Sequence, residues 1–189
     1  MKIVKRSADN VVLFTGNDLV LDEAGLRGAG WTFRSNIDPN DLVLDEADEI
    51  PEGFVGGGWT YANGVWTINT VGEQSLLPAK RAEKIAELQA IVLALVYSDI
   101  THAGQTWKTD ADSRALLAQT LAVGSVPEDM YWRDASGTPH TMTYAELQAL
   151  ARAIFDRGFA ADKNMEAKKA AIAAATTAAQ IDSITWEGE

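Results

Sequence analysis

The fold class is decided by a ten-residue hairpin sequence, Trp59-Thr-Tyr-Ala-Asn-Gly-Val-Trp-Thr-Ile68, which closes a β-rich half of the chain just before a helical half begins. Asn63-Gly64 supplies the two positive-φ positions that a type I′ turn requires, so the residues on either side are predicted to pair as antiparallel strands. In that register Tyr61 lies opposite Trp66, and an aromatic pair of this kind contributes about 0.5–1 kcal/mol.

The same hairpin supplies the candidate partner-contact residues, Trp59, Tyr61 and Trp66. Aromatic side chains anchor interfaces as well as cores. Two interpretations therefore stay open: these rings pack into a core, or one face of the hairpin is exposed for docking a partner or a glycan. The more C-terminal tryptophans, Trp107, Trp132 and Trp186, are expected to be core residues.

Short β-type runs separated by Gly, Asn and Asp precede the hairpin. They are Ile3-Val4, Val11 to Phe14, Leu19 to Leu21, Trp31 to Phe33, and Leu42 to Leu44. The sequence therefore predicts a small N-terminal antiparallel β module over residues 1–75.

One octapeptide occurs twice without change, as Asn17-Asp-Leu-Val-Leu-Asp-Glu-Ala24 and as Asn40-Asp-Leu-Val-Leu-Asp-Glu-Ala47. Repeat architectures need about three or more units, and only two copies are present. We therefore interpret them as a local duplication that gives two similar short strands.

From about Pro78 the hydrophobic pattern becomes helical. Ile85, Leu88, Val92 and Leu95 follow a 3, 4, 3 spacing, which predicts one helix over roughly residues 78–98. This stripe also has heptad spacing, but two heptads fall short of the three or four that indicate a coiled coil. A helix packed within its own domain is favoured over a homotrimeric seam.

The rest of the chain is predicted to alternate two small hairpins with helices. One hairpin turns at Ala103-Gly104 and the other between Asp134 and Gly137, and Thr109 with Asp112 could cap a helix that runs through Leu121. The sequence thus predicts an α+β fold, with a mainly helical domain with short β-hairpins over residues 78–189.

The capping box Thr143-Tyr-Ala-Glu146 predicts the start of the following helix. That helix is expected to direct four apolar side chains inward and to end or bend at Gly158; the four are Leu147, Leu150, Ile154 and Phe155. Thr177-Ala-Ala-Gln180 repeats the capping pattern, and a last short helix is expected to deliver Ile181, Ile184 and Trp186 to the core.

Charge and composition exclude several function classes. A formal net charge of −11 disfavours phosphate backbones and anionic membrane surfaces, so no nucleic-acid partner is predicted. The longest apolar helix candidate, Ile85 to Tyr97, is too short to span a bilayer, so no membrane insertion is predicted. The chain has no cysteine and begins without the apolar core of a signal peptide, which favours synthesis in a reducing cytoplasm.

No catalytic or cofactor-binding residue is predicted, and the chain is predicted not to be an enzyme. His102 and His140 lie in hairpins without a sequence-level partner, although a Ser–His–Asp set can assemble in space. Carboxylates at Arg133-Asp134 and at Asp110 to Asp112 are expected to serve a turn and a helix cap. Gly56-Gly-Gly58 precedes a strand, whereas glycine-rich phosphate loops lead into a helix.

No metal site is predicted either. Three residues match positions one, three and twelve of a calcium-binding loop, namely Asp38, Asn40 and Glu49. That loop needs an oxygen ligand at position five and a glycine at position six, where this chain has Leu42 and Val43. The acidic run is therefore interpreted as a solvated connection.

Five segments between Leu88 and Trp186 share the order and spacing of one domain family. They are Thr101-His-Ala-Gly-Gln-Thr-Trp-Lys-Thr-Asp110 with Ser113-Arg-Ala-Leu-Leu117, Tyr131-Trp-Arg-Asp-Ala-Ser-Gly137, Met142-Thr-Tyr-Ala-Glu-Leu147, Lys169-Ala-Ala-Ile172, and Thr176-Thr-Ala-Ala-Gln-Ile-Asp-Ser-Ile184. This half of the chain resembles an uncharacterised domain family found in tail-fibre, baseplate and tail-assembly proteins of tailed bacteriophages. The resemblance carries over no site residue.

The resemblance implies a non-enzymatic structural or adaptor component of a phage tail, tail fibre or baseplate, which would use the β module at residues 1–75 for attachment. Such a protein would be made in the bacterial host cytoplasm, reside in the virion, contact other tail proteins and form homo-oligomers. An alternative is a tail-fibre assembly chaperone that binds the fibre tip. A more remote alternative is a glycan-active enzyme, which would need a cleft with paired carboxylates.

Overall fold

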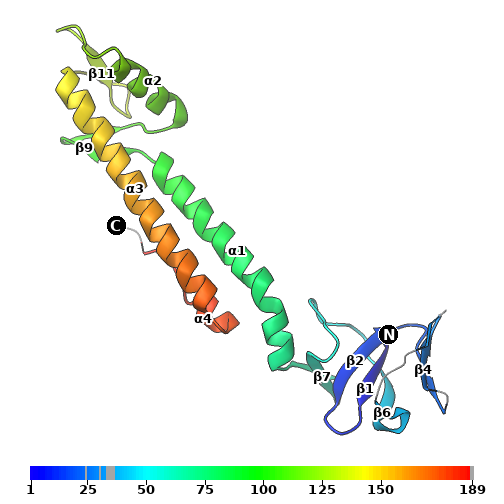
Figure 1. The fold of residues 1–189 in the computed structure, drawn as a ribbon. Coiled ribbons are helices and arrows are strands. Elements are labelled where there is room, and N and C mark those ends of the chain that lie inside the picture. The colour runs from blue at the N-terminus through cyan, green and yellow to red at the C-terminus, as the bar shows by residue number, and fades with distance from the viewer. Residues whose placement is uncertain (24, 30, 33–36, 188–189) are drawn as a thin grey trace. The chain divides into compact units, whose positions relative to one another are not determined.

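The computed structural model describes residues 1–23, 25–29, 31–32 and 37–187, and its architecture is α+β (Figure 1). An antiparallel five-stranded sheet comes first, and helices with short β-hairpins follow, as the sequence predicts. The chain divides into two compact units: Met1–Arg81 with Ala175–Ile181, and Ala82–Ala174 with the residues from Asp182 onward. The predicted boundary at residues 75–78 lies close to Arg81, but the prediction did not include the return of residues 175–181 to the first unit.

The strands of the first unit form two sheets. The larger has the order β6-β1-β2-β7-β8, and β3, β4 and β5 form the smaller one. The elements are β1 Lys2–Arg6, β2 Val11–Gly16, β3 Val20–Asp22, β4 Gly25–Gly28, β5 Trp31–Thr32, a 3₁₀ turn η1 at Pro39–Asp41, β6 Leu42–Glu46, β7 Trp59–Ala62 and β8 Val65–Ile68. Of the predicted strand Trp31 to Phe33, Phe33 lies outside the described residues. Strand β4 was not predicted, because two of its four residues are glycines, which disfavour strands.

The duplicated octapeptide gives two short strands, β3 and β6, as predicted, with Ala24 of the first copy outside the described residues. The copies lie in different sheets, yet their equivalent leucines, Leu19 and Leu42, are buried in one hydrophobic cluster. Equivalent aspartates, Asp22 and Asp45, each form an ion pair with a basic side chain of a neighbouring strand. The repeated sequence thus makes the same kind of contacts twice.

Helix α1 extends from Thr70 to Tyr97, so the predicted start at Pro78 is wrong. Asn69 caps the helix, because its Oδ1 accepts hydrogen bonds from the amides of Val71 at 2.9 Å and Gly72 at 3.2 Å. The position of Pro78 was misleading: proline is most common in the first turn of a helix, whereas Pro78 lies in the interior of α1.

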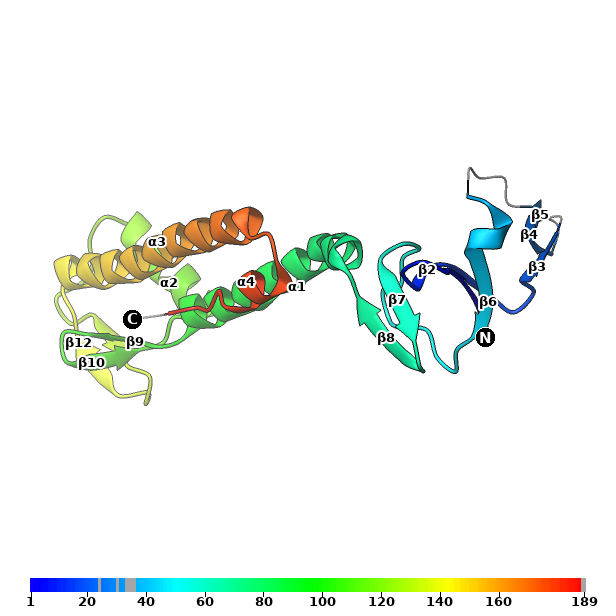
Figure 2. The same ribbon diagram turned by 90° about the horizontal axis from the view of Figure 1, so that it is seen from below.

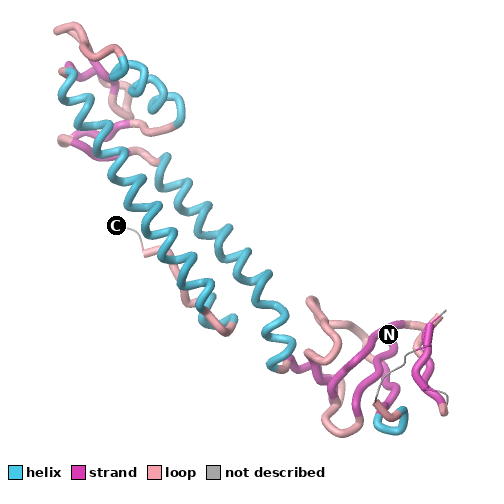
Figure 3. Tube along the Cα trace, in the orientation of Figure 1, coloured by secondary structure: helices cyan, strands magenta, loops and turns pink. Residues whose placement is uncertain are grey.

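The second unit places two hairpins and a short helix around the N-terminal end of α3 (Figure 3). Its elements are β9 Ile100–His102, β10 Gln105–Trp107, α2 Ala111–Ala122, β11 Tyr131–Arg133, β12 Pro139–Thr141 and α3 Tyr144–Ala174, and the short helix α4 Ala178–Asp182 follows. Both predicted hairpins are confirmed, with Ala103 and Gly104 at positive φ in the first. The hairpins join where the Ala135 amide donates to the carbonyl of Thr106 at 2.8 Å.

The capping box at the start of α3 is confirmed. The amide of Glu146 donates to Thr143 Oγ1 at 3.3 Å, and the Thr143 amide donates back to the Glu146 carboxylate at 2.7 Å. The predicted cap of α2 is wrong: Asp110 caps it by accepting from the Ser113 amide at 2.8 Å. Thr109 is fully buried instead, where its hydroxyl donates to the carbonyl of Ser98.

Two expectations for α3 are also wrong. Leu147, Leu150 and Ile154 are buried as predicted, but Phe155 is 58% exposed, because it lies at the margin of the buried face. The helix also continues through Gly158 to Ala174, since one glycine inside a helix costs only about 1 kcal/mol relative to alanine.

Within the second unit, α1 and α3 lie side by side and antiparallel (Figure 1 and Figure 2). Leu88 of the predicted stripe is fully buried against Met165 and Ile172 of α3, and Ile184 and Trp186 pack on the same cluster. This packing agrees with a helix that serves its own domain. In the described part of the chain, no helix combines the length and apolar character needed to cross a membrane.

Candidate binding pocket on the helical unit

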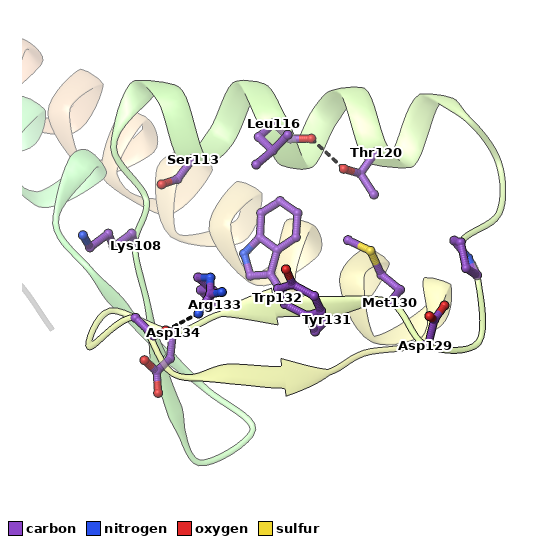
Figure 4. Close-up of a pocket in the computed structure, with 12 residues that line it drawn as sticks. Lys108, Ser113, Leu116, Thr120, Asp129, Met130, Tyr131, Trp132, Arg133 and Asp134 are labelled. Carbon is purple, nitrogen blue, oxygen red and sulfur yellow. Dashed lines mark hydrogen bonds between the residues drawn. The ribbon is translucent and has the colours of Figure 1, made fainter.

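A pocket of about 660 Å³ lies between helix α2 and strand β11 (Figure 4). Ser113, Leu116 and Thr120 line it from α2; they are spaced i, i+3 and i+7, which places them on one face of the helix. Strand β11 lines the opposite wall with all three of its residues. Successive strand residues point to opposite faces, so a pocket bounded by all three lies along the edge of the strand.

The pocket has an apolar middle. Trp132 is buried in the main hydrophobic cluster of this unit, and Met130 packs against that cluster. On the facing wall Leu116 is 55% exposed although it is apolar. Apolar lining with a small number of polar groups at the rim is the usual composition of ligand pockets.

Charged side chains lie at the two ends of the pocket. Lys108 and Arg133 lie at one end, and Asp129 lies at the other (Figure 4). The Arg133 guanidinium is held in place, because Nη1 donates to the carbonyl of Gly137 at 2.8 Å and the group lies 5.2 Å from the ring centroid of Tyr131. The pocket therefore has a cationic end and an anionic end.

Asp134 lies beside Arg133, but its carboxylate serves the β11–β12 turn. It accepts from Ser136 Oγ at 2.6 Å and from the amides of Ser136 and Thr138 at 2.9 Å, and its second oxygen lies 2.9 Å from His140 Nε2. These contacts, Ser136 foremost and then His140, lower the pKa of Asp134. Ser136 and His140 each bind the carboxylate, whereas in a Ser–His–Asp triad the histidine binds the serine.

The stability of this hairpin should depend on pH through Asp134. Its pKa in the folded state lies below the ordinary value of 3.8, so the ionised carboxylate stabilises the fold above about pH 4 and loses this effect as pH falls further. Asp134→Asn should therefore be less stable than the native protein at pH 7, and the difference should shrink from pH 4 downward. Urea unfolding at a series of pH values measures this, and a difference that stays constant to pH 2 would contradict it.

A second surface lies on the other side of α2, where α2 meets α3. A groove of about 430 Å³ is lined there by mostly apolar residues, among them Leu117, Leu121, Phe155 and Phe159. The two phenylalanines stack with ring centroids 5.8 Å apart and an interplanar angle of 9°. They are 58% and 54% exposed, so the pair stands at the surface beside the groove.

The aromatic hairpin of the first unit is more enclosed. Asn63 and Gly64 have positive φ and Tyr61 pairs with Trp66, as predicted, with ring centroids 4.8 Å apart. Tyr61 is only 9% exposed, while Trp59 and Trp66 are half-buried. Trp66 Nε1 donates to the carbonyl of Glu49 at 3.0 Å. The accessible surface of this trio therefore comes from the two tryptophans.

Residues 79–185, more than half of the chain, match a family described as a domain of unknown function, DUF4376. The chain belongs to the DUF4376 family. No curated protein and no solved structure gives a match. The pocket and the Phe155/Phe159 groove both lie inside the DUF4376 domain, and the aromatic hairpin at residues 59–68 lies before it.

The other residues considered from sequence have structural roles. Asp38 caps η1 by accepting from the amide of Asn40 at 2.9 Å, and Leu42 is buried. Gly58 is needed because a Cβ there would lie 2.6 Å from the Cα of Gly72. His102 lies in the β9–β10 hairpin, where its carbonyl accepts from Trp107 Nε1 at 3.1 Å. Among the residues described, no group of three or more histidine and acidic side chains could hold a metal ion.

Sequence reasoning missed both surfaces of the DUF4376 domain. The pocket forms between one face of α2 and the β11–β12 hairpin, which follows α2 in the chain. The distance that the fold leaves between these two elements cannot be obtained from the spacing of residues in the sequence. A signal for the Phe155/Phe159 surface was present, because residues four apart share one helix face and Phe159 extends that face beyond Phe155.

Proposed function

We propose that this DUF4376 protein is a non-enzymatic structural or adaptor component of the tail, tail fibre or baseplate of a tailed bacteriophage. In this proposal it is made in the host cytoplasm, is incorporated into the virion, and contacts other tail proteins as well as further copies of itself. The family resemblance described above motivates the phage setting, and the surface of the helical unit supports the adaptor role.

The observation that carries the adaptor role is the stacked, exposed pair Phe155 and Phe159 beside an apolar groove. Contiguous apolar surface on a soluble protein usually marks an interaction site. Each ring also has a cation above it, since Arg152 lies 5.5 Å from the Phe155 centroid and Lys163 lies 5.9 Å from that of Phe159. Aromatic residues and arginine are enriched at protein interfaces, which fits the Phe155 and Arg152 pair.

The architecture also suits a protein that links partners. Each compact unit has hydrophobic clusters of its own, so each can present a separate surface. In the first unit that surface includes Trp59 and Trp66, and in the second it includes the two phenylalanines.

Mass spectrometry of purified phage particles tests the setting, together with light scattering of the protein alone and mixed with the products of neighbouring genes. Copies of the protein retained in particles would support the proposal. A protein absent from particles that binds a fibre in the lysate would be an assembly chaperone. A protein that is neither retained in particles nor bound to a fibre would contradict the proposal.

Replacing both phenylalanines with alanine should reduce association without unfolding the protein. Each truncated anchor should weaken the contact by about 1–2 kcal/mol, or roughly tenfold or more in Kd. The melting temperature should change little, because the rings are more than half exposed and alanine favours helix. Leu93→Ala is the matched control, since Leu93 is 61% exposed on α1. An equal loss of association in the double phenylalanine variant and in Leu93→Ala would mean that the groove is not the contact surface.

A further inference from the structure

We infer that the pocket between α2 and β11 binds an extended segment of a partner protein, which adds to the edge of β11 as a further strand. The inference rests on the proposed function only in taking a protein as the partner. It concerns the pocket in Figure 4, a different surface from the Phe155/Phe159 groove.

The backbone of β11 has one edge directed away from β12. The Met142 amide donates to the carbonyl of Met130 at 3.0 Å, and the Asp134 amide donates to the carbonyl of Thr138 at 2.9 Å. In an antiparallel pair, alternate residues direct their N–H and C=O groups toward the partner strand. The backbone groups of Tyr131 and Arg133 therefore point to the opposite edge, which is the wall of the pocket.

Helix α2 forms the other wall of a slot that fits a strand. The lining residues Ser113 and Thr120 are seven positions apart, which spans about 10 Å of helix. An extended chain rises about 3.3 Å per residue, so about three residues of a bound segment would lie along the slot. Main-chain hydrogen bonds to Tyr131 and Arg133 would provide affinity, as in strand addition to a sheet edge.

The lining indicates which side chains the segment carries. An apolar side chain fits between Leu116 and Trp132 in the middle of the pocket. An acidic side chain fits at the end with Lys108 and Arg133, where the guanidinium is already held by Gly137 and Tyr131. Asp134 also lines this end and is ionised, but its oxygens bind Ser136 and His140, and the two cations Lys108 and Arg133 leave the end with a net positive charge.

A displayed library of random dodecapeptides, panned against the full-length protein, provides the probe. Peptides that enrich are expected to carry an apolar residue and an aspartate or glutamate at a fixed spacing. The Kd of a labelled winner is then measured by fluorescence anisotropy against three variants: Leu116→Gln, Lys108→Glu, and Leu93→Gln as the matched control on α1.

Leu116→Gln and Lys108→Glu should each weaken binding by about tenfold or more, and Leu93→Gln should leave it unchanged. Methylating the peptide backbone nitrogens one at a time should abolish binding at alternate positions, because only those amides face β11. Slower hydrogen exchange of the Tyr131 and Arg133 amides in the complex would support the same geometry.

Three outcomes would overturn the inference. In the first, no peptide enriches more strongly on the native protein than on the Leu116→Gln variant; in the second, N-methylation of the peptide leaves its Kd unchanged. In the third, the protein self-associates and Leu116→Gln alone removes this association, which would make the occupant a second copy. These results are separable from the fate of the proposed function. Peptide binding by a protein absent from particles would sink the virion proposal alone, and a particle protein that binds no peptide would sink the strand-addition site alone.

Discussion

Replacing Leu147 with alanine should lower the free energy of unfolding by about 3–4 kcal/mol, because it leaves a cavity in the main cluster of the helical unit. Leu147 is fully buried in the first turn of α3 and packs in the cluster that contains Trp107 and Trp132. Urea unfolding followed by circular dichroism and tryptophan fluorescence measures the loss.

The matched control is Leu116→Ala, since Leu116 is exposed on α2 in the same unit. Its effect on stability should stay within about 0.5 kcal/mol. This control also shows whether substitutions at Leu116 leave the protein folded, which the peptide-binding test requires. A loss of the same size in both variants would mean that Leu147 is not part of a close-packed core.

Replacing Arg157 with methionine should cost about 3 kcal/mol, because Arg157 closes the C-terminal end of α1. Its Nη2 donates to the carbonyls of Val96 at 2.9 Å and Ser98 at 2.8 Å and to Thr109 Oγ1 at 2.8 Å, and Nη1 donates to the carbonyl of Asp99 at 3.1 Å. The last carbonyls of a helix lack partners within it, and a cation there is favoured by the helix dipole. Hydrogen bonds from charged groups contribute about 1.5–3 kcal/mol, and the substitution removes all four that are named here.

Arg152→Met provides the comparison five residues earlier on α3. Arg152 forms an exposed ion pair with Asp156 at 2.8 Å and lies over the exposed ring of Phe155, so its loss should change stability by less than about 1 kcal/mol. Burial lowers the pKa of Arg157, with a further contribution from nearby Arg114, which agrees with its enclosed position. If the two variants unfolded at the same urea concentration, the closing role of Arg157 would be wrong.

Local signals predicted the elements of this fold well. Asn63-Gly64, Ala103-Gly104 and the Thr143 to Glu146 capping box each act through neighbouring residues, and each is confirmed. The start of α1 was wrong because the decisive group, the Asn69 side chain, caps a first turn with little hydrophobic periodicity. Thr109 and Asp110 are adjacent potential caps, and only the tertiary contact of Thr109 with Ser98 and Arg157 separates their roles.

The candidate site was not predictable in the same way. Arg133 and Lys108 come from different hairpins, and what makes them a pair is the joining of those hairpins through Ala135 and Thr106. Phe155 fits the apolar pattern of its helix, so periodicity placed it inward. Phe155 lies at the margin of the buried face of α3, and whether such a position is covered depends on the element packed beside it. Here α2 ends at Ala122 and leaves the Phe155 ring exposed.

The assignment of residues 175–181 to the first compact unit has a consequence for synthesis. Leu77 packs with Ala175 and Ile181, and Arg81 Nη2 donates to the carbonyl of Ala175 at 2.8 Å. The ribosome makes the whole of α3 before it makes this segment, although the strands of the first unit were made long before. The sheet can therefore form early during translation. Leu77, in the first part of α1, is covered only after residues 175–181 have been made. A nascent chain that stalled before Ala175 would expose Leu77 to chaperones and proteases.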